Sequence, residues 1–473
     1  MRYVSTRGRA PPVSFFDAVL AGLAPGGGLY VPETWPQLFA SPAGRRNAAN
    51  GHFSALMAGA LKTFAGDDIG SDEVAPIVNA AYVRWIDAED RGVWPPVVTP
   101  LVQQLPGLWT LELFHGPSLS FKDVALQLIG PLLDFALKKR NRRLSVVCAT
   151  SGDTGGAAVE ALKGRERIDL FVLLPKSRVS DVQRRFMTTS GAENVHAIEI
   201  DGDFDACQAI VKTLFQDADF ANRASLSGVN SINWARILAQ SVYYHAAAHT
   251  LAANGPVSFV VPTGNFGDAF SGHVAKRCGA PIGKIVLAVN ANDILARALE
   301  TGRYERAAFS QATLSPAMDI QVASNFERIL FEALDRDGDA VRGLYERFAQ
   351  SGGVDIPPAA LEALRKDFDA VSINDEQTAA TMRNHLPYVA CPHTAVALAA
   401  VAAVAEPLDE PVVTLATAHP AKFPETVEAA TGISPALPAW CADLHARTER
   451  IDALPNDAEA VKRTIRERTR AWA

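Results

Sequence analysis

The chain has 473 residues, of which 48% are hydrophobic and 21% charged, and this is enough to bury the cores of two or three domains. With a formal charge of −7 and only one short basic run, Lys138–Arg143, the composition argues against nucleic acid and membranes as partners. The five cysteines are scattered and form no metal-ligand spacing, so we expect a reduced, cytoplasmic protein without a bound metal.

The first 96 residues are rich in glycine and proline, as in APGGGLYVPETWP at residues 24–36. They end within the proline-rich stretch WPPVVTP, residues 94–100, which is typical of a linker. We therefore predict an N-terminal domain over residues 1–96. The N-terminus lacks the apolar segment of a signal peptide, and the longest apolar run, Ala395–Ala405, is too short to span a membrane.

Residues 97–425 alternate short β-branched runs with longer helical patterns. For example, strand-like LSVVCAT (144–150) and IDLFVLLP (168–175) flank the helical pattern GGAAVEALKG (155–164). Strands that are apolar on both faces and alternate with helices predict an α/β core with mainly parallel sheets. Such sheets bind ligands at the carboxyl ends of their strands. We predict that residues 426–473 form a charged, helical C-terminal tail.

The stretch HGPSLSFKD, residues 115–123, places a lysine between a strand-like run and an apolar helical segment. Lys122 lies among apolar and turn-forming residues near the carboxyl edge of the predicted sheet, and we expect Asp123 to cap the following helix. Apolar surroundings and a helix N-terminus favour the neutral amine, which is the form that makes a Schiff base. A surface lysine is the alternative interpretation.

Three loops that end predicted strands follow along the chain. ATSGDTGG (149–156) and PTGNFGD (262–268) have small residues that let backbone amides approach an anion, and the dipole of the following helix adds to the attraction. Neither has the spacing of a P-loop or a dinucleotide-binding fingerprint, so each is a lysine-free anion cup or an ordinary connection. The third loop, ATAHPAKF (416–423), places Thr417 at the end of its strand.

Together, these loops match the requirements of pyridoxal 5′-phosphate. The cofactor needs a lysine for its aldehyde, a cup for its phosphate and a partner for its ring nitrogen. Lys122, the loop at residues 262–268 and the hydroxyl of Thr417 provide one group for each requirement. The sequence therefore predicts a pyridoxal-phosphate enzyme with its site at the carboxyl edge of a sheet.

Six motifs, in their order and spacing, resemble the threonine synthase family in its longer form with an N-terminal domain. They are HGPSLSFKD (115–123), ATSGDTGG (149–156), NSINWARILAQ (230–240), PTGNFGDAF (262–270), MDIQVASNFERILF (318–331) and TAHPAKF (417–423). The resemblance implies a tryptophan-synthase-β-like fold (fold type II), with two α/β lobes of mainly parallel sheets and an N-terminal domain. It also implies conversion of O-phospho-L-homoserine and water to L-threonine and phosphate, the last step of threonine biosynthesis.

The same resemblance assigns residues to the cofactor and the substrate. Lys122 matches the family's Schiff-base lysine, and Thr417 matches the hydroxyl residue at the ring nitrogen. The loop that holds the cofactor phosphate matches Gly264, Asn265, Phe266, Gly267 and Asp268, the last of which is expected to arrange the loop. The loop that receives the substrate α-carboxylate matches Ser151, Gly152, Asp153 and Thr154.

The phosphate of the substrate is a dianion and needs cationic or amide partners. Asn233 and Arg236 in NSINWAR are candidates for this role, with a surface position as the alternative for each. Three upstream cations are further candidates: Lys176, Arg184 and Arg185. His115 and His419 lie beside the motifs and either assist proton transfer or serve as structural hydrogen-bond partners.

Two other functions are compatible with parts of the sequence. A serine/threonine dehydratase or a cysteine synthase would share the Lys122 loop and the phosphate cup, but the stretches 230–240 and 318–331 favour threonine synthase. A non-catalytic protein that binds a phosphorylated metabolite would keep the fold and would not need Lys122. We expect a monomer or a homodimer that acts on a small molecule.

Overall fold

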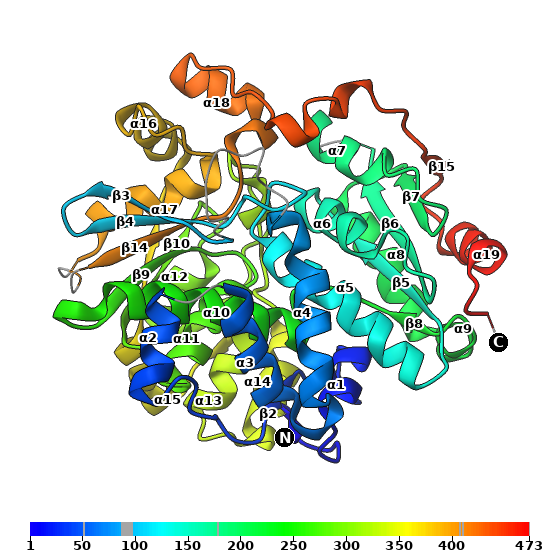
Figure 1. Cartoon of the computed structure of the whole chain (residues 1–473), viewed down its shortest axis with the longest axis horizontal. Coiled ribbons are helices and arrows are strands. Elements are labelled where there is room, and N and C mark those ends of the chain that lie inside the picture. Colours follow the sequence, from blue (N-terminus) through cyan, green and yellow to red (C-terminus); the bar gives the residue numbers. More distant parts are fainter. Residues whose placement is uncertain (51–52, 87–97, 177–178, 406–407, 409–410, 473) are drawn as a thin grey trace.

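The computed structural model describes residues 1–50, 53–86, 98–176, 179–405, 408 and 411–472. The predicted domain boundary at 96/97 and the first part of the linker, residues 94–97, lie outside the described residues. Figure 1 shows two lobes, each built on a sheet, with a group of N-terminal helices (blue) packed beside them. Both sheets are mainly parallel, which confirms the predicted α/β architecture.

The larger sheet has six strands in the order β13-β10-β9-β14-β4-β3, and its neighbours are parallel except for β3 and β4. Every residue of β9 is buried, because helices cover both faces of the sheet. Successive side chains point to opposite faces, so Val260 packs with helix α17 while Phe259 and Val261 join the main core. The strands are β3 (Leu101–Leu105), β4 (Leu108–Glu112), β9 (Val257–Pro262), β10 (Ile282–Val289), β13 (Phe368–Ser372) and β14 (Val412–Ala416).

The smaller sheet has five parallel strands in the order β15-β7-β6-β5-β8. Helices α6 and α7 contact each other in this lobe, while α8 packs against β5 and β6 and against α19. The strands are β5 (Leu144–Ala149), β6 (Ile168–Pro175), β7 (Val195–Ile200), β8 (Leu226–Ser227) and β15 (Asp452–Leu454). The helices are α6 (Asp153–Leu162), α7 (Asp181–Thr188), α8 (Phe204–Gln216), α9 (Ala218–Arg223) and α19 (Ala458–Arg468).

The N-terminal region shares its core with the lobes instead of enclosing a core of its own. Helix α4 packs on α5, and helices α2 and α3 pack on α10, so side chains such as Tyr82 and Trp85 lie in the main hydrophobic cluster. Strands β1 (Tyr3–Ser5) and β2 (Tyr30–Pro32) pair antiparallel. The helices are α1 (Phe15–Ala21), α2 (Pro42–Asn50), α3 (Phe53–Ala65), α4 (Ser71–Ile86), α5 (Lys122–Lys139) and α10 (Trp234–Leu251).

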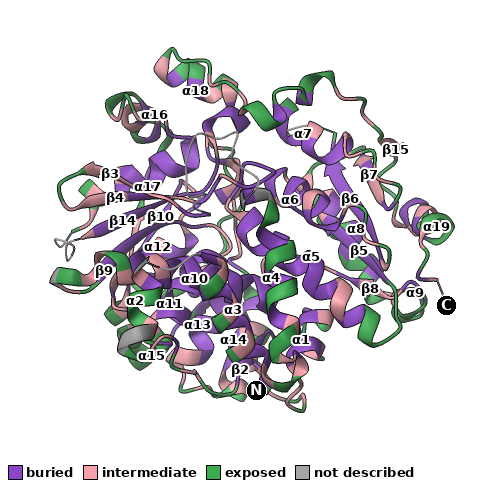
Figure 2. Cartoon of the chain, in the orientation of Figure 1, coloured by how far each residue is buried: buried purple, intermediate pink, exposed green. Residues whose placement is uncertain are grey.

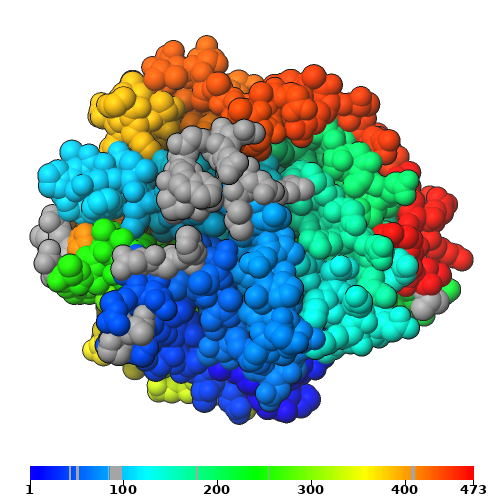
Figure 3. All heavy atoms as spheres, in the orientation of Figure 1, coloured from blue at the N-terminus to red at the C-terminus, as the bar shows by residue number. Residues whose placement is uncertain are grey.

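The C-terminal segment follows the outer edge of the five-stranded lobe, where Figure 3 shows it in red. It was expected to be helical, but it also adds the strand β15, which pairs with β7. The remaining larger helices belong to the six-stranded lobe and its surroundings: α11 (Gly267–Arg277), α12 (Ile294–Thr301), α13 (Phe326–Ala333), α14 (Gly338–Ser351), α15 (Pro358–Asp367), α16 (Asp375–Asn384), α17 (Pro392–Ala403) and α18 (Pro424–Thr431). Two short strands, β11 (Arg303–Glu305) and β12 (Gly353–Asp355), form a separate antiparallel pair.

Buried residues concentrate in the two sheets and in helices α5 and α10, as Figure 2 shows in purple. None of the described helices is long and apolar enough to cross a membrane. Strands β4, β5, β9 and β14 all lead into loops that line one cavity, which therefore lies at the carboxyl ends of strands from both sheets.

Candidate active site

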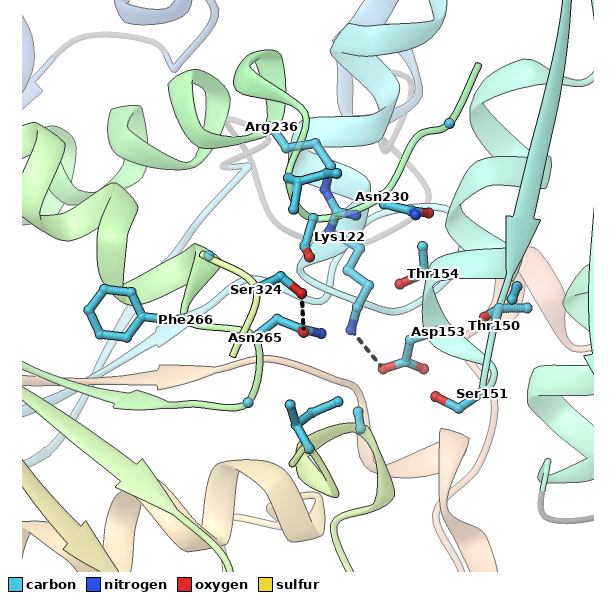
Figure 4. Close-up of a pocket in the computed structure, with 18 of the residues that line it drawn as sticks. Lys122, Thr150, Ser151, Asp153, Thr154, Asn230, Arg236, Asn265, Phe266 and Ser324 are labelled. Atoms are coloured by element: carbon cyan, nitrogen blue, oxygen red, sulfur yellow. Dashed lines mark hydrogen bonds and ion pairs between the residues drawn. The ribbon is translucent and has the colours of Figure 1, made fainter. Parts of the chain in front are cut away.

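A cavity of about 860 Å³ lies between the two lobes. It is lined by the start of α5, by the loops after β5 and β9 and by Thr417 after β14. Residues 228, 230–232 and 236, before and within α10, also line it. Helix α8 and the loop after α1 also line the cavity, and we call this part, which includes the exposed side chains of Leu23 and Phe215, the mouth. Figure 4 shows Lys122, Asp153, Asn265 and Arg236 directed toward this space. The structure thus brings together the three loops that the sequence analysis selected.

Lys122 is the first residue of helix α5, and its ammonium points across the cavity toward Asp153. The Nζ atom lies 3.4 Å from Asp153 Oδ2 and 4.5 Å from the centre of the Phe121 ring. Burial lowers the pKa of Lys122, the nearby Asp153 carboxylate opposes this effect, and the cations Arg236 and Lys422 add to it. The amine is therefore closer to its neutral, nucleophilic form than an exposed lysine.

The loop before Lys122 is held in place by Asp123. We expected Asp123 to cap α5, but the N-cap position is Phe121, two residues earlier, and the helix begins at Lys122. The carboxylate of Asp123 instead accepts hydrogen bonds from the amide and the hydroxyl of Ser118, both at 2.8 Å. The loop also contacts the end of β14, because Phe121 N donates to Thr417 O at 2.8 Å. Lys122 and Thr417 are therefore fixed relative to each other by the backbone.

The loop after β9 forms a cup of backbone amides at the start of α11. Phe266 has a left-handed conformation with φ of 62°, and its ring packs on Phe326 and Phe368, away from the cavity. At Gly264, a Cβ atom would lie 3.0 Å from Ile320 Cγ1 and 3.2 Å from Ala317 O. The cup keeps its open form because position 264 carries no side chain, and with the N-terminus of α11 it fits a phosphate group.

Asp268 lies behind this cup and is bound by two tyrosines. Its Oδ1 accepts hydrogen bonds from the hydroxyls of Tyr243 and Tyr244, the second at 3.0 Å. Burial raises the pKa of Asp268 to about 6, although both tyrosines and the charge of Lys122 lower it. Its Oδ2 has no hydrogen-bond partner among the described residues. Asn265 accepts from Ser324 Oγ at 3.3 Å, and its carbonyl accepts from Asn325 N at 3.0 Å, which fixes the other side of the loop.

The loop after β5 brings Ser151, Asp153 and Thr154 to the cavity. Gly152 does not line it, but it adopts φ of 138°, and a Cβ there would lie 2.5 Å from the Gln183 side chain. This glycine leaves room for Gln183 Nε2 to donate to Asp153 Oδ1 at 2.9 Å. Asp153 also begins helix α6, whose N-terminus favours a negative charge. The loop therefore presents the hydroxyl groups of Ser151 and Thr154 and one fixed carboxylate to the cavity, and Thr150 lines the cavity beside them.

Arg236 is the cation of NSINWAR that reaches the cavity. It is buried, and its Nη1 donates to Val229 O at 3.2 Å, whereas Nε has no partner among the described residues. Burial lowers the pKa of this guanidinium to about 10. Asn233 has a different role, because its Oδ1 caps α10 at Ala235 N and its Nδ2 donates to Val19 O at 2.8 Å.

Lys176, Arg184 and Arg185 do not line the cavity. Lys176 lies 3.4 Å from Asp201 with its side chain 63% exposed. Arg184 pairs with Glu199 and, at 3.0 Å, with Glu449. Arg185 pairs with Asp181 at 2.9 Å. Arg184 and Arg185 are paired with carboxylates outside the cavity, and Lys176 is largely exposed, so none of the three is part of the cavity lining.

The two histidines beside the motifs also lie outside the cavity lining. His115 Nε2 lies 2.7 Å from Glu112 Oε2, and His419 Nδ1 accepts a hydrogen bond from Ala421 N at 3.1 Å. Thr417, in contrast, is buried and lines the cavity. The contacts of His115 and His419 therefore fit a role as structural hydrogen-bond partners.

Several cavity residues were not selected from the sequence. Asn230 and Ser231 lie beside Arg236, and their only signal was membership of the NSINWAR motif. His393, at the start of α17, accepts from Ala317 N at 3.1 Å, and burial lowers its pKa to about 4. Lys422 lies next to the cavity and pairs with Asp153 at 2.8 Å. The sequence did offer one signal for Lys422, because it belongs to the motif TAHPAKF, which follows a predicted strand.

The fold and this cavity define a pyridoxal-phosphate-dependent enzyme of two α/β lobes. Residues 97–418 match the family of pyridoxal-phosphate dependent enzymes, and residues 2–82 and 394–465 match the N-terminal and C-terminal regions of threonine synthase. A threonine synthase of Pseudomonas aeruginosa is 44% identical over 467 residues, covering 98% of this chain and 97% of its own. The chain belongs to the threonine synthase family.

Solved structures agree with this assignment. The crystal structure of threonine synthase from Brucella melitensis with bound pyridoxal phosphate superposes with a TM-score of 0.94 at 48% identity, covering 100% of both chains. Yeast threonine synthase superposes with a TM-score of 0.90 at 36% identity, covering 99% of this chain and 98% of its own. The similarity includes the N-terminal region and both lobes.

Proposed function

We propose that this chain converts O-phospho-L-homoserine and water into L-threonine and phosphate. One observation carries the proposal: a partly buried lysine facing an amide cup shares its cavity with the buried cation Arg236, whose Nε has no partner among the described residues. A substrate that has both an amino group and a phosphate dianion matches these two centres. The name of the threonine synthase relatives supports L-threonine as the product.

Pyridoxal phosphate would be held at three points. Lys122 would take its aldehyde, the amides of residues 264–268 its phosphate, and Thr417 its ring nitrogen. Bound in this way, the cofactor withdraws electrons from Cα of the substrate. Asp268 would support the cup from behind, because Tyr243 and Tyr244 hold its carboxyl group. The neutral hydroxyl of Thr417 does not enforce protonation of the ring nitrogen, as a carboxylate would.

The substrate would be held at both of its charged ends. Its α-carboxylate suits the hydroxyls of Ser151 and Thr154 together with the backbone amides at the start of α6. Its phosphate suits Arg236, with the side chains of Asn230 and Ser231 nearby. Lys176, Arg184 and Arg185 are not part of this proposal, because carboxylates outside the cavity hold them.

Lys122 would carry the proton transfers along the short substrate. Once the substrate amino group takes its place on the cofactor, the Lys122 amine removes the proton at Cα. This first proton would be held on the cofactor while the neutral amine removes a second proton at Cβ, which allows phosphate to leave from Cγ, and the ammonium formed in this step would return its proton to Cγ. Water would then add its hydroxyl at Cβ and give its proton to the departed phosphate, and Lys122 would return the first proton to Cα before it releases threonine. Asp153, 3.4 Å from Nζ, keeps the amine directed into the cavity.

The mouth of the cavity would close during this sequence to exclude water until it is needed. Leu23 from the loop after α1 and Phe215 from α8 both line the cavity while 45% and 40% exposed. Movement of the five-stranded lobe toward the cup would bury these two side chains. Early opening would release the unsaturated product of phosphate loss, which hydrolyses to 2-oxobutyrate.

The test is the product analysis of the purified enzyme with O-phospho-L-homoserine. We expect phosphate and L-threonine in equal amounts, measured by a phosphate assay and by chromatography of the amino acids. L-serine and L-threonine, offered as sole substrates, should give no more than traces of keto acid. A keto acid as the main product, or no phosphate release, would instead favour a dehydratase or another enzyme of this fold.

We also propose that the enzyme acts in the cytoplasm, as a monomer or a homodimer, and divides into residues 1–96, 97–425 and 426–473. The five cysteines are free and buried, which supports a reducing environment. Size-exclusion chromatography with light scattering tests the oligomeric state. Limited proteolysis tests the division of the chain: the shared core of the N-terminal helices and the lobes predicts that these parts unfold together.

A further inference from the structure

A second lysine, Lys422, is fully buried beside the cavity, although buried lysines are rare without a dedicated partner. It ends the 3-10 helix η5 (Pro420–Lys422), which follows β14 in the six-stranded lobe. Its Nζ donates to Ser118 O at 2.8 Å and lies 2.8 Å from Asp153 Oδ1. Its carbonyl accepts from Ser180 Oγ at 2.9 Å. These contacts fix both the backbone and the ammonium of Lys422.

Asp153 stands between two lysines and is bound unequally to them. Lys422 lies 2.8 Å from Oδ1, and Gln183 Nε2 donates to the same oxygen at 2.9 Å. Lys122 lies 3.4 Å from the other oxygen, Oδ2. Because the attraction between two charges grows as they approach, the carboxylate is bound more strongly to Lys422 than to Lys122.

Other charged groups also surround Lys122, and they include both cations and carboxylates. Arg236 on α10 and Lys422 on η5 oppose its protonation, whereas Asp153 on α6 favours it. The Lys122 charge also acts on Asp268 of α11 and His393 of α17. Asp123, next to Lys122 on α5, is turned toward Ser118, and burial raises its pKa to about 6.

We propose that Lys422 is a positioning residue that draws the Asp153 carboxylate toward itself, so that Lys122 keeps a partner without being locked in an ion pair. This inference rests on the role of Lys122 in the proposed function. A free lysine is protonated at neutral pH, and a buried carboxylate at close range would hold it in that form. Lys122 must be neutral to bond the cofactor aldehyde and to accept a proton from Cα. Because Lys422 binds Asp153 more closely, Lys122 can become neutral although a carboxylate lies in the site.

The test follows cofactor binding in the absence of substrate. Full-length chain stripped of its cofactor is mixed with pyridoxal phosphate, and the rate at which visible absorbance appears is measured from pH 6 to pH 10. In Lys422→Met, the pH at which this rate is half-maximal should rise by about one unit, so that the rate at pH 7 falls about tenfold and recovers at high pH. No substrate is involved, so a failure of the phosphate-release assay leaves this result interpretable.

Lys276→Met is the matched control. Lys276 also contacts one carbonyl and one carboxylate at 2.8 Å, Gly283 O and Asp367 Oδ1, but it does not line the cavity. The Lys276→Met variant should therefore have the same pH profile of cofactor binding as the wild type. Lys422→Arg, which keeps the cation, should retain most of the wild-type profile.

Replacement of the Asp153 carboxylate should shift the pH profile in the opposite direction. Asp153→Asn should shift the half-maximal pH below that of the wild type, and adding it to Lys422→Met should cancel the upward shift. If thermal unfolding shows that Lys422→Met does not fold, the Asp153→Asn variant alone still tests the proposal. A rate that falls equally at every pH in Lys422→Met, or an unchanged profile in Asp153→Asn, would overturn the proposal and leave Lys422 with a structural role only.

Discussion

The cofactor side of the cavity and its mouth are built differently. On the cofactor side, Asp268 and Thr417 are buried, Phe266 is anchored among other aromatic rings, and Gly264 fits against Ile320 without room for a side chain. At the mouth, Leu23 and Phe215 are partly exposed. The first region is already shaped for its ligand, whereas the second has apolar surface left to bury. From this comparison we expect the cofactor to bind to a preformed cup and substrate binding to drive the proposed closure.

Lys122→Ala should have the largest effect, because it removes the nucleophile and the proton carrier together. We expect turnover to fall by at least about 10⁴-fold, while the thermal unfolding temperature of the cofactor-free chain stays close to that of the wild type. Steady-state phosphate release and circular dichroism measure the two quantities. Substantial residual turnover in Lys122→Ala would remove Lys122 from the centre of the mechanism.

Arg236→Ala should have the next largest effect, on the substrate side. Loss of a buried phosphate partner should lower kcat by about 10²-fold or more and raise the fraction of 2-oxobutyrate, because phosphate binding helps to close the site. Arg184→Ala is the control, since Arg184 pairs with Glu199 and Glu449 outside the cavity. Equal losses in both variants would show that the cavity geometry does not identify the phosphate partner.

Thr417→Asp changes the residue that we propose as the partner of the ring nitrogen on the cofactor side. A carboxylate would hold a proton on that nitrogen and draw too many electrons into the ring, away from the bond to the leaving phosphate. We expect kcat to fall about 30-fold, which corresponds to ~2 kcal/mol. Thr417→Ser, which keeps the hydroxyl, is the control. An Asp variant with the wild-type rate and visible spectrum would mean that Thr417 does not meet the ring nitrogen.

Gly264→Ala tests whether the cup is preformed. Its Cβ would press on Ile320 and Ala317, so we expect pyridoxal phosphate to bind about tenfold more weakly, measured by fluorescence titration of the cofactor-free chain. The control is Gly343→Ala on α14, where the nearest atom, Arg347 Nη1, lies 3.4 Å from the added Cβ. Unchanged affinity in Gly264→Ala would indicate that the cup adjusts easily.

Phe215→Ala should have the smallest effect and should appear at the mouth. We expect kcat to fall only about two- to threefold, with a higher fraction of 2-oxobutyrate, because less apolar surface is buried on closure. Phe309→Ala removes a ring that is 75% exposed and does not line the cavity, and it should change neither quantity. If product ratios are identical in the two variants, Phe215 takes no part in closure.

The sequence predicted the parts of the site that depend on local structure. A strand, a small-residue loop and a helix follow one another along the chain, and this pattern placed Lys122, the cup at Gly264–Asp268 and Thr417 at strand ends. The sequence could not show which distant charges pair. Arg184 was selected as a cation, but Glu449 of the C-terminal segment binds it, and Lys422 was not selected although it binds Asp153.

The start of α5 shows a second limit. Asp123 is a favourable N-cap residue by type, but its carboxylate bonds to Ser118, because the loop from Ser118 to Ser120 has to turn back against β14. Local propensity predicted that a helix begins there, and tertiary contacts decided at which residue. The N-terminal region is a similar case: its glycine- and proline-rich composition predicted a domain over residues 1–96, but composition could not show that the apolar faces of its helices pack into the common core.

The most direct test of the central claim is the location of the covalent bond to the cofactor. The holoenzyme is reduced with borohydride and digested, and the peptide that carries the pyridoxyl group is identified by mass spectrometry. We predict a single labelled peptide with the modification on Lys122. The same label on Lys422, which is buried beside the cavity, or on any third lysine would contradict the assignment of the site.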